Sequence, residues 1–133
     1  VPVLMVGLDA TLKHQISRTQ LAALTHDLGD AGDFIWQIKQ HYLNFYASKG
    51  IFDGFPIHDA TAALGMAFPD DFKMAAGALR CVTEGEQRGR TIFSERQGGF
   101  HQVALSAEGA ELSQRFDAMM RAQFGAPSSA PVE

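Results

Sequence analysis

The sequence predicts an α/β fold that contains one buried parallel strand, several helices and a small antiparallel meander. Three observations support this fold class. Residues 1–8 form an almost entirely apolar run, which is typical of a strand that is covered on both faces of a parallel sheet. Within residues 17–68, apolar side chains recur at spacings of three and four, which indicates helices. Residues 75–105 alternate short β-prone stretches with glycines, which indicates antiparallel hairpins.

Composition limits the classes of partner. A chain of 133 residues suffices for one domain, and 46% hydrophobic with 20% charged residues is ordinary for a globular protein. The formal net charge of −4 provides no basic face, so we expect no nucleic-acid polymer and no membrane as partner. A small neutral ligand fits better. Cys81 is the only cysteine, which excludes an intramolecular disulfide and cysteine-rich zinc sites and predicts a cytoplasmic location.

The first part of the chain predicts a strand, a loop and a helix. Val3–Leu8 is the expected strand, and Gly7–Thr11 should open a loop at its end, where α/β sheets carry ligand groups. Ser17 is expected to cap the next helix, with Gln20 as its capping-box partner. That helix should end near Gly29.

A long helix is predicted over residues 33–49, with Gly50 as its C-terminal stop. Trp36 lies outside its apolar seam and indicates a subunit contact, since Trp is enriched in interface cores. The apolar residues that recur at helical spacing, and should form its buried face, are Phe34, Ile35, Ile38, Tyr42, Phe45 and Tyr46.

The next segment predicts a short helix and the meander. An aromatic and glycine-rich loop over residues 51–57 should lead into a helix from His58 to Phe68, which Pro69 ends. Gly89 and the pair Gly98–Gly99 are the expected turns between the strands of the meander. These three strands are predicted over Ala75–Val82, Arg90–Ser94 and His101–Leu105.

A last amphipathic helix is predicted over residues 107–124, with Ser106 as its cap. Residues 125–133 contain too few apolar side chains to pack, so we expect a flexible tail. The side chains expected on the inward face of the helix are Leu112, Phe116, Met119 and Met120.

The strongest candidate for chemistry is the pair His58–Asp59 at the predicted start of a helix. A helix N-terminus presents free N–H groups and the positive end of the helix dipole, so an aspartate can cap it while the preceding histidine faces a cleft. The alternative is that Asp59 only caps the helix and His58 is an ordinary loop histidine. The remaining histidines lie in polar stretches and are predicted at the surface: His14, His26, His41 and His101.

Tyr42 and Tyr46 also have two interpretations. They are four residues apart, hence on one helical face, and can close over an aromatic base by stacking or hydrogen bonding. Aromatic side chains at helical spacing are also typical of a core, so both residues can equally serve packing.

Four segments in a fixed order resemble a known family. They are residues 1–11, Asn44-Phe45-Tyr46, the stretch 56–62 with Pro69 downstream, and residues 88–91. In this order and spacing they resemble the C-terminal segment of the inosine-uridine nucleoside hydrolase family. The resemblance implies a nucleoside-hydrolase-like fold in which Tyr42 and Tyr46 lie over the base pocket. It further implies that His58 is the general acid and that Asp59 binds the catalytic calcium and the substrate.

Several features of the family are absent or changed. Leu12 replaces a histidine after the Leu-Asp-x-Thr signature, and Ala60 replaces a proline after the His-Asp pair. The family's N-terminal aspartate cluster and its ribose-binding Asn and Glu are not found in these residues. We therefore expect residues 1–124 to be the C-terminal segment of a nucleoside hydrolase domain, with most calcium ligands outside this chain.

The expected function of the complete protein is calcium-assisted hydrolysis of the N-glycosidic bond of ribonucleosides, and this segment by itself is expected to be inactive. Cleavage passes through an oxocarbenium-like state, in which a water must become nucleophilic while the leaving base is neutralised. One carboxylate, Asp59, is not enough for a calcium ion that takes six to eight oxygen ligands. The alternative is a non-catalytic relic or a subunit that a partner chain completes. The resemblance also implies a homo-oligomer.

Overall fold

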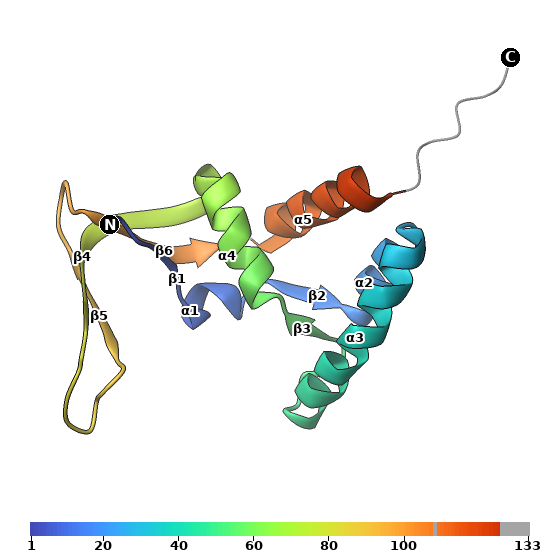
Figure 1. Cartoon of the computed structure of the whole chain (residues 1–133), viewed down its shortest axis with the longest axis horizontal. Coiled ribbons are helices and arrows are strands. Elements are labelled where there is room, and N and C mark those ends of the chain that lie inside the picture. The colour runs from blue at the N-terminus through green and yellow to red at the C-terminus, as the bar shows by residue number, and fades with distance from the viewer. Residues whose placement is uncertain (108, 126–133) are drawn as a thin grey trace, which may run out of the picture.

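The computed structural model describes residues 1–107 and 109–125, which form the mixed α/β fold that the sequence predicts. Figure 1 shows a four-stranded sheet beside α4, a two-stranded ribbon that leads into a helix pair, and α5 extending over the gap between them. The elements are β1 (Leu4–Val6), α1 (Leu8–Thr11), β2 (Gln15–Ser17), α2 (Arg18–His26), α3 (Gly29–Ser48), β3 (Gly54–Pro56), α4 (His58–Ala67), the 3-10 turn η1 (Pro69–Asp71), β4 (Phe72–Cys81), β5 (Thr91–Glu95), β6 (His101–Ala107) and α5 (Gly109–Phe124).

The four-stranded sheet has the order β1-β6-β4-β5 and contains one parallel pair. β1 runs parallel to β6, with Met5 opposite Val103, which confirms the predicted parallel strand. In the described part of the chain β1 lies at the edge of the sheet, and its three residues are half-buried. Within the described residues β6 is its one neighbour, so the other edge of the strand is uncovered.

The three later strands are confirmed, but they do not form a meander. β4 lies between β5 and β6, and Gly77 pairs with Glu95 on one side and with His101 on the other. The connection between β5 and β6 therefore crosses β4. A Cβ atom on Gly99 would lie 2.3 Å from the backbone nitrogen of Gly77, so this crossing requires glycine.

The predicted loop over Gly7–Thr11 is wrong, because residues 8–11 form the short helix α1. The backbone carbonyl of Gly7 accepts from the N–H groups of Ala10 at 3.1 Å and Thr11 at 3.0 Å. This turn buries Ala10 and Thr11. The following strand β2 was not predicted, because its three residues are too few for a period-two pattern; it pairs antiparallel with β3.

The helix pair α2–α3 begins at the predicted capping box. Ser17 Oγ accepts from the backbone N–H of Gln20 at 3.1 Å, and Gln20 Oε1 accepts from the backbone N–H of Ser17 at 2.9 Å. α3 begins at Gly29, four residues before the predicted start. Gly32 permits this early start, since a Cβ atom there would lie 1.7 Å from the carbonyl oxygen of Thr25.

The buried face of α3 differs from the predicted seam. Leu43 is buried, and Trp36, which was predicted to mark a subunit contact, packs against the same core together with Ile35 and Tyr46. Because Gly32 lies close to the backbone of Thr25, the side of α3 that carries Trp36 and Leu43 faces α2. Four members of the predicted seam are therefore exposed: Phe34, Ile38, Tyr42 and Phe45.

The last elements largely follow the sequence. α4 begins at His58 as predicted. Ser106 pairs with Lys73 in the sheet, so the predicted cap of the last helix is wrong, and α5 is described from Gly109. Leu112 is fully buried, whereas Met119 is 48% exposed and does not face inward as predicted. Residues 126–133 of the predicted tail lie outside the described residues.

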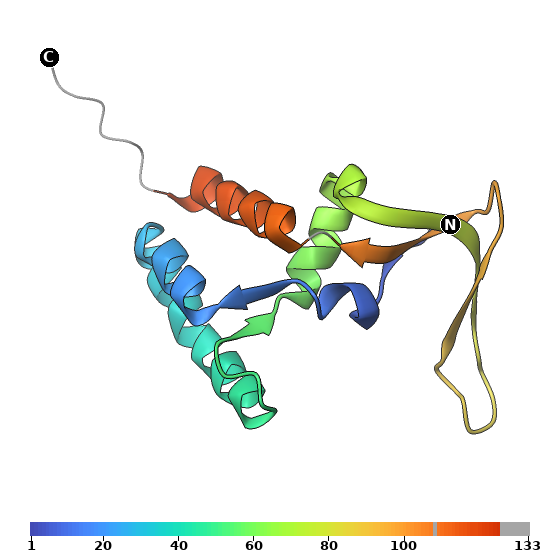
Figure 2. The same cartoon turned by 180° about the vertical axis from the view of Figure 1, so that it is seen from behind.

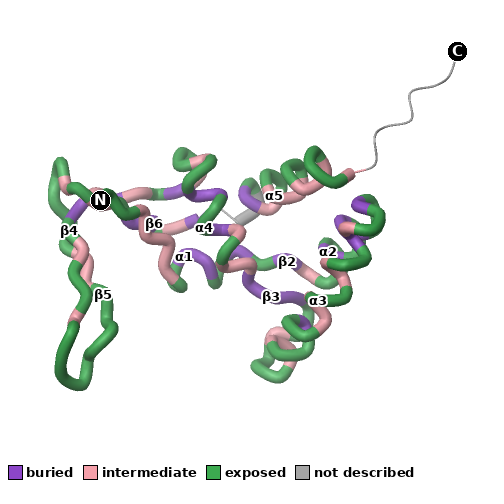
Figure 3. Tube along the Cα trace, in the orientation of Figure 1, coloured by how far each residue is buried: buried purple, intermediate pink, exposed green. Residues whose placement is uncertain are grey.

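Two hydrophobic clusters form the core, and Figure 3 shows the buried segments of the chain in purple. One lies between the sheet, α1, α4 and α5 and includes Leu64 and Phe72. The other lies between α2, α3 and the ribbon and includes Leu24 and Phe55. Phe116 of α5 packs against both clusters and so connects them. In the part of the chain that the structure describes, no helix combines the length and the hydropathy needed to cross a membrane.

Replacement of Gly32 by alanine should destabilise the helix pair. The new Cβ would overlap the Thr25 carbonyl, and overpacking of this kind typically costs about 1–3 kcal/mol. Gly65→Ala is the matched control, because Gly65 is also helical and its Cβ would lie 3.3 Å from a Val6 methyl group. Thermal unfolding should show a clear loss for Gly32→Ala and little change for Gly65→Ala. Equal midpoints for the two variants would contradict this packing.

Candidate functional site

His58 lies between two hydroxyl groups at the start of α4. Its Nδ1 is 2.7 Å from Thr11 Oγ1, and its Nε2 is 3.0 Å from the hydroxyl oxygen of Tyr46. The last residue of α1, the first residue of α4 and the C-terminal part of α3 therefore meet at one half-buried imidazole. The prediction that His58 and Tyr46 belong to one site is consistent with this geometry, and Thr11 is an addition that the sequence did not reveal.

Both partners of His58 can donate or accept a hydrogen bond. A hydroxyl group carries one proton and free lone pairs, so it can serve either tautomer of the ring and the imidazolium as well. The two hydroxyl contacts are therefore compatible with a proton on either ring nitrogen of His58.

A second Thr–His pair lies beside the first, with the residue types exchanged. His14 Nδ1 is 2.7 Å from Thr61 Oγ1, and Thr61 Oγ1 donates to the carbonyl of Ile57 at 2.7 Å. In Figures 1 and 2 the chain segment after α1 passes the start of α4, where these contacts form. Thr11-x-x-His14 faces His58-x-x-Thr61, so the equal spacing was a signal in the sequence that could have suggested the contact.

His14 is fully buried, so the prediction that it lies at the surface is wrong. Thr61 already donates its single proton to Ile57, hence it must accept from an Nδ1–H of His14. His14 Nε2 has no hydrogen-bond partner among the described residues, so a proton there would be unsatisfied. Burial accordingly lowers the pKa of His14 from its ordinary value of 6.5.

The two tyrosines share a face, as predicted, and their rings are adjacent. The ring centroids of Tyr42 and Tyr46 are 6.4 Å apart with planes at 25°, and Tyr42 also contacts Phe55 at 5.7 Å. Tyr42 is 43% exposed and therefore not a core residue, whereas Tyr46 is half-buried. The ammonium of Lys39 lies 4.6 Å from the Tyr42 ring centroid. The exposed ring of Tyr42 thus extends an aromatic surface outward from His58.

Asp59 is exposed and does not cap α4. The N-cap residue is Ile57, and no side chain caps this helix, so the alternative that Asp59 only serves as a cap is wrong. Within residues 1–107 and 109–125 no three His, Cys, Asp or Glu side chains lie close enough to hold a metal ion. The described residues alone therefore do not fit a calcium ion that takes six to eight oxygen ligands.

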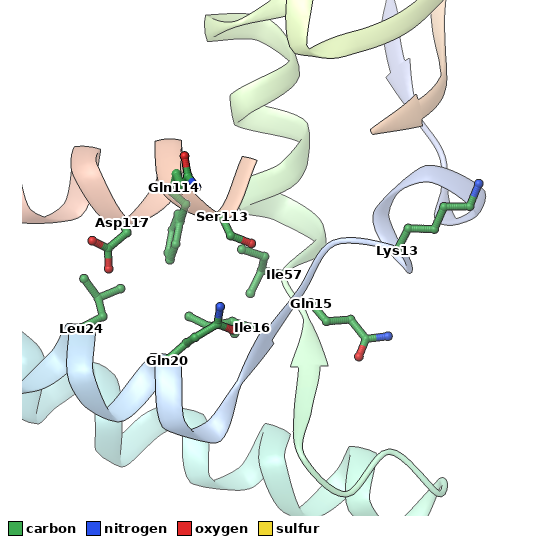
Figure 4. A pocket seen from close by; sticks show the side chains of 10 residues that line it. Lys13, Gln15, Ile16, Gln20, Leu24, Ile57, Ser113, Gln114 and Asp117 are labelled. Carbon is green, nitrogen blue, oxygen red and sulfur yellow. The ribbon is translucent and has the colours of Figure 1, made fainter. Parts of the chain in front are cut away.

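A cleft of about 790 Å³ separates α5 from α2 and β2 (Figure 4). Its apolar lining includes Ile16, Leu24 and Phe116, and Lys13 and Asp117 are among its polar side chains. The predicted site residues His58, Asp59, Tyr42 and Tyr46 do not line it. The cleft adjoins the Thr–His pairs at Ile57, Lys13 and Gln15 but does not include the imidazole of His58.

The burial of His14 should make the stability depend on pH. The lowered pKa means that the unfolded chain binds more protons than the folded chain once the pH falls below about 6.5. The contribution of His14 to stability should hence be present at about pH 7.5 and be lost progressively as the pH falls toward about 5.5. Thermal unfolding of His14→Gln should show a smaller slope over this window than the unchanged protein. His26→Gln, at an exposed position, is the control and should retain the slope; an unchanged slope in His14→Gln would refute this origin.

Comparison with known proteins gives a consistent result. A family model described as inosine-uridine preferring nucleoside hydrolase matches residues 1–120. A curated protein of Oryza sativa subsp. japonica, "Probable uridine nucleosidase 1", is 24% identical over 91 residues, which are 68% of this chain and 28% of that protein. The solved structure of a purine-preferring ribonucleoside hydrolase from Gardnerella vaginalis has a TM-score of 0.81 at 24% identity and covers 92% of this chain. An inosine-guanosine nucleoside hydrolase has a TM-score of 0.74 at 15% identity and covers 95% of it.

These solved structures share the fold, and this chain spans 40% of the length of each. The parallel pair β1–β6, the helix that begins at His58 and the match over residues 1–120 agree with the resemblance seen in the sequence. The chain belongs to the inosine-uridine preferring nucleoside hydrolase family.

Proposed function

We propose that this protein takes part in hydrolysis of the N-glycosidic bond of ribonucleosides, releasing ribose and a free base, with His58 as the general acid. The observation that carries the proposal is the imidazole of His58 held between the hydroxyl groups of Thr11 and Tyr46. The curated relative is named as a uridine nucleosidase, and the Gardnerella relative as a purine-preferring hydrolase. A nucleoside is thus the substrate class that we propose here.

The chemistry explains why a positioned imidazole is useful. Cleavage of the bond between C1′ and the base nitrogen leaves negative charge on the base, and a proton delivered to the base neutralises it. Histidine suits this step because its ordinary pKa lies near neutral pH. We propose that the proton resides on Nε2, beside the hydroxyl of Tyr46, and passes to the base as the bond breaks. Tyr46 is then either displaced by the base or relays the proton.

Tyr42 and Tyr46 are the proposed contacts for the base. The 43% exposed ring of Tyr42 offers a face for stacking, and the hydroxyl of Tyr46 lies at the proposed proton donor. Aromatic pairs contribute about 0.5–1.5 kcal/mol beyond the area that they bury. Stacking on Tyr42 would bring a base toward Tyr46, because the two rings are nearly parallel neighbours.

Asp59 is the proposed link to calcium and ribose. Its exposed carboxylate follows His58 directly and makes no capping bond. We propose that it supplies one oxygen ligand to a calcium ion and contacts the ribose hydroxyls, while the other ligands lie outside the described residues. Such an ion would supply the positive charge that acidifies a bound water.

Further parts of the proposal concern the assembly. Residues 1–124 would form the C-terminal segment of a hydrolase domain, in agreement with a match over residues 1–120 and a span of 40% of the solved relatives. The single cysteine, Cys81, is in line with a cytoplasmic location. A homo-oligomer is proposed by analogy with the family.

Replacement of His58 by alanine should discriminate between substrates. In an assembly that includes the remaining calcium ligands, we expect hydrolysis of inosine and uridine to fall about 10²–10⁴-fold, which is the typical contribution of general-acid catalysis. Hydrolysis of p-nitrophenyl riboside should change little, because its leaving group departs without a proton. His41→Ala, at an exposed position of α3, is the matched control and should behave like the unchanged protein. Equal losses on both kinds of substrate would exclude the proposed role of His58.

Replacement of Asp59 by asparagine should weaken calcium binding. In an assembly that includes the remaining calcium ligands, removing this charged oxygen ligand should raise the calcium dissociation constant about tenfold or more, and kcat/KM should fall by a similar factor for every nucleoside. Isothermal titration with calcium and assays on two nucleosides measure both effects. Asp70→Asn, another exposed aspartate near a helix end, is the control. Unchanged calcium affinity in Asp59→Asn would remove this residue from the proposed site.

A further inference from the structure

We propose that His14 is a positioning residue, which fixes the first turn of α4 through Thr61 and thereby holds His58 in place between Thr11 and Tyr46. The positional part of this inference rests on contacts alone. Its catalytic consequence rests on the proposed function of His58.

His14 binds the backbone N–H of Ile57, the residue before His58, directly, and reaches the carbonyl of Ile57 through Thr61. The N–H of Ile57 donates to the backbone carbonyl of His14 at 3.2 Å. The carbonyl of Ile57 accepts from Thr61 Oγ1 at 2.7 Å, and Thr61 Oγ1 accepts from the Nδ1–H of His14, also at 2.7 Å. Ile57 is thus enclosed in a ring of hydrogen bonds that begins and ends at one residue of another segment.

The ring of hydrogen bonds lies at the start of α4, which no side chain caps. The N-cap residue Ile57 makes no side-chain cap bond, and its φ of −103° and ψ of 71° are not helical. A helix without a capping side chain has free N–H groups in its first turn, so the start of the helix is poorly defined by itself. The buried link from His14 supplies the missing constraint.

The same two segments carry the proposed catalytic contact. Thr11 and His14 lie three residues apart on one segment, and His58 and Thr61 lie three residues apart on the other. A shift of α4 along the first segment would therefore change the 2.7 Å distance between Thr11 and His58 together with that between His14 and Thr61. Both Thr61 and His14 are completely buried, so loss of their bond would leave unsatisfied polar groups.

Thr61→Val tests the link, because valine retains the shape of threonine and removes the hydroxyl. Thr61→Ser is the rescue variant, since it restores the hydroxyl. Thr25→Val is the matched control: Thr25 is also buried in a helix, and its hydroxyl donates to the carbonyl of Leu21, four residues earlier, at 2.9 Å. Thr61→Val and Thr25→Val each remove a buried hydroxyl from a helix, so both variants should lose stability for this reason.

Two readouts separate positioning from stability. Nitrogen-15 NMR at fixed pH should show the ring signals of His58 displaced in Thr61→Val, unchanged in Thr25→Val and restored in Thr61→Ser. In an assembly that also supplies the calcium ligands lying outside the described residues, kcat for inosine or uridine should fall about tenfold in Thr61→Val with KM little changed, while p-nitrophenyl riboside is hydrolysed normally. If the ring signals move and that assembly does not hydrolyse nucleosides, the proposed function fails and the positioning role stands.

Other outcomes would overturn the inference. Identical His58 signals in Thr61→Val and the unchanged protein, or equal displacement in Thr61→Val and Thr25→Val, would show that the link does not position His58. The unchanged protein provides a test that does not depend on folding of a variant. His14 should carry its proton on Nδ1, and a spectrum with the proton on Nε2 would refute the hydrogen-bond ring.

Discussion

The contact between residues 11–14 and residues 57–61 is the constraint on which the arrangement depends. It consists of two Thr–His hydrogen bonds of 2.7 Å and a backbone hydrogen bond from Ile57 to His14. β2 begins directly after the first segment and β3 ends directly before the second, so the contact also joins the ribbon to the sheet region. Buried polar groups are destabilising unless they are paired, and each pair therefore permits only a narrow range of positions.

α5 also connects the sheet region with the ribbon and the helix pair. Leu112 is buried among the sheet and α4, and Phe116 packs against both hydrophobic clusters. Arg121 of α5 forms an ion pair with Asp27, the residue that directly follows α2. Exposed ion pairs contribute little, so the apolar contacts of Phe116 hold the two regions more firmly than this pair does. The candidate site hence lies at the boundary between the two hydrophobic clusters.

The sequence predicted correctly those structural features that depend only on neighbouring residues. The capping box of Ser17 and the helix start at His58 followed from residues within one turn of each other, and both are observed. The order of the segments that resemble nucleoside hydrolases was enough to identify the family before any contact was known. The spacing of Tyr42 and Tyr46 placed them on one helical face for the same reason, since the helical period alone determines it.

The sequence by itself determined the secondary structure around His58, the shared face of the tyrosines and the family. Only the tertiary structure decided which groups His58 touches, that His14 is buried, and that β4 separates β5 from β6. It also decided which side of α3 is covered, because the approach of Gly32 to Thr25 turns Trp36 inward and leaves Tyr42 exposed. The Thr–His contacts join residues that are 47 positions apart in the sequence, and their distance is fixed by packing and not by any local pattern.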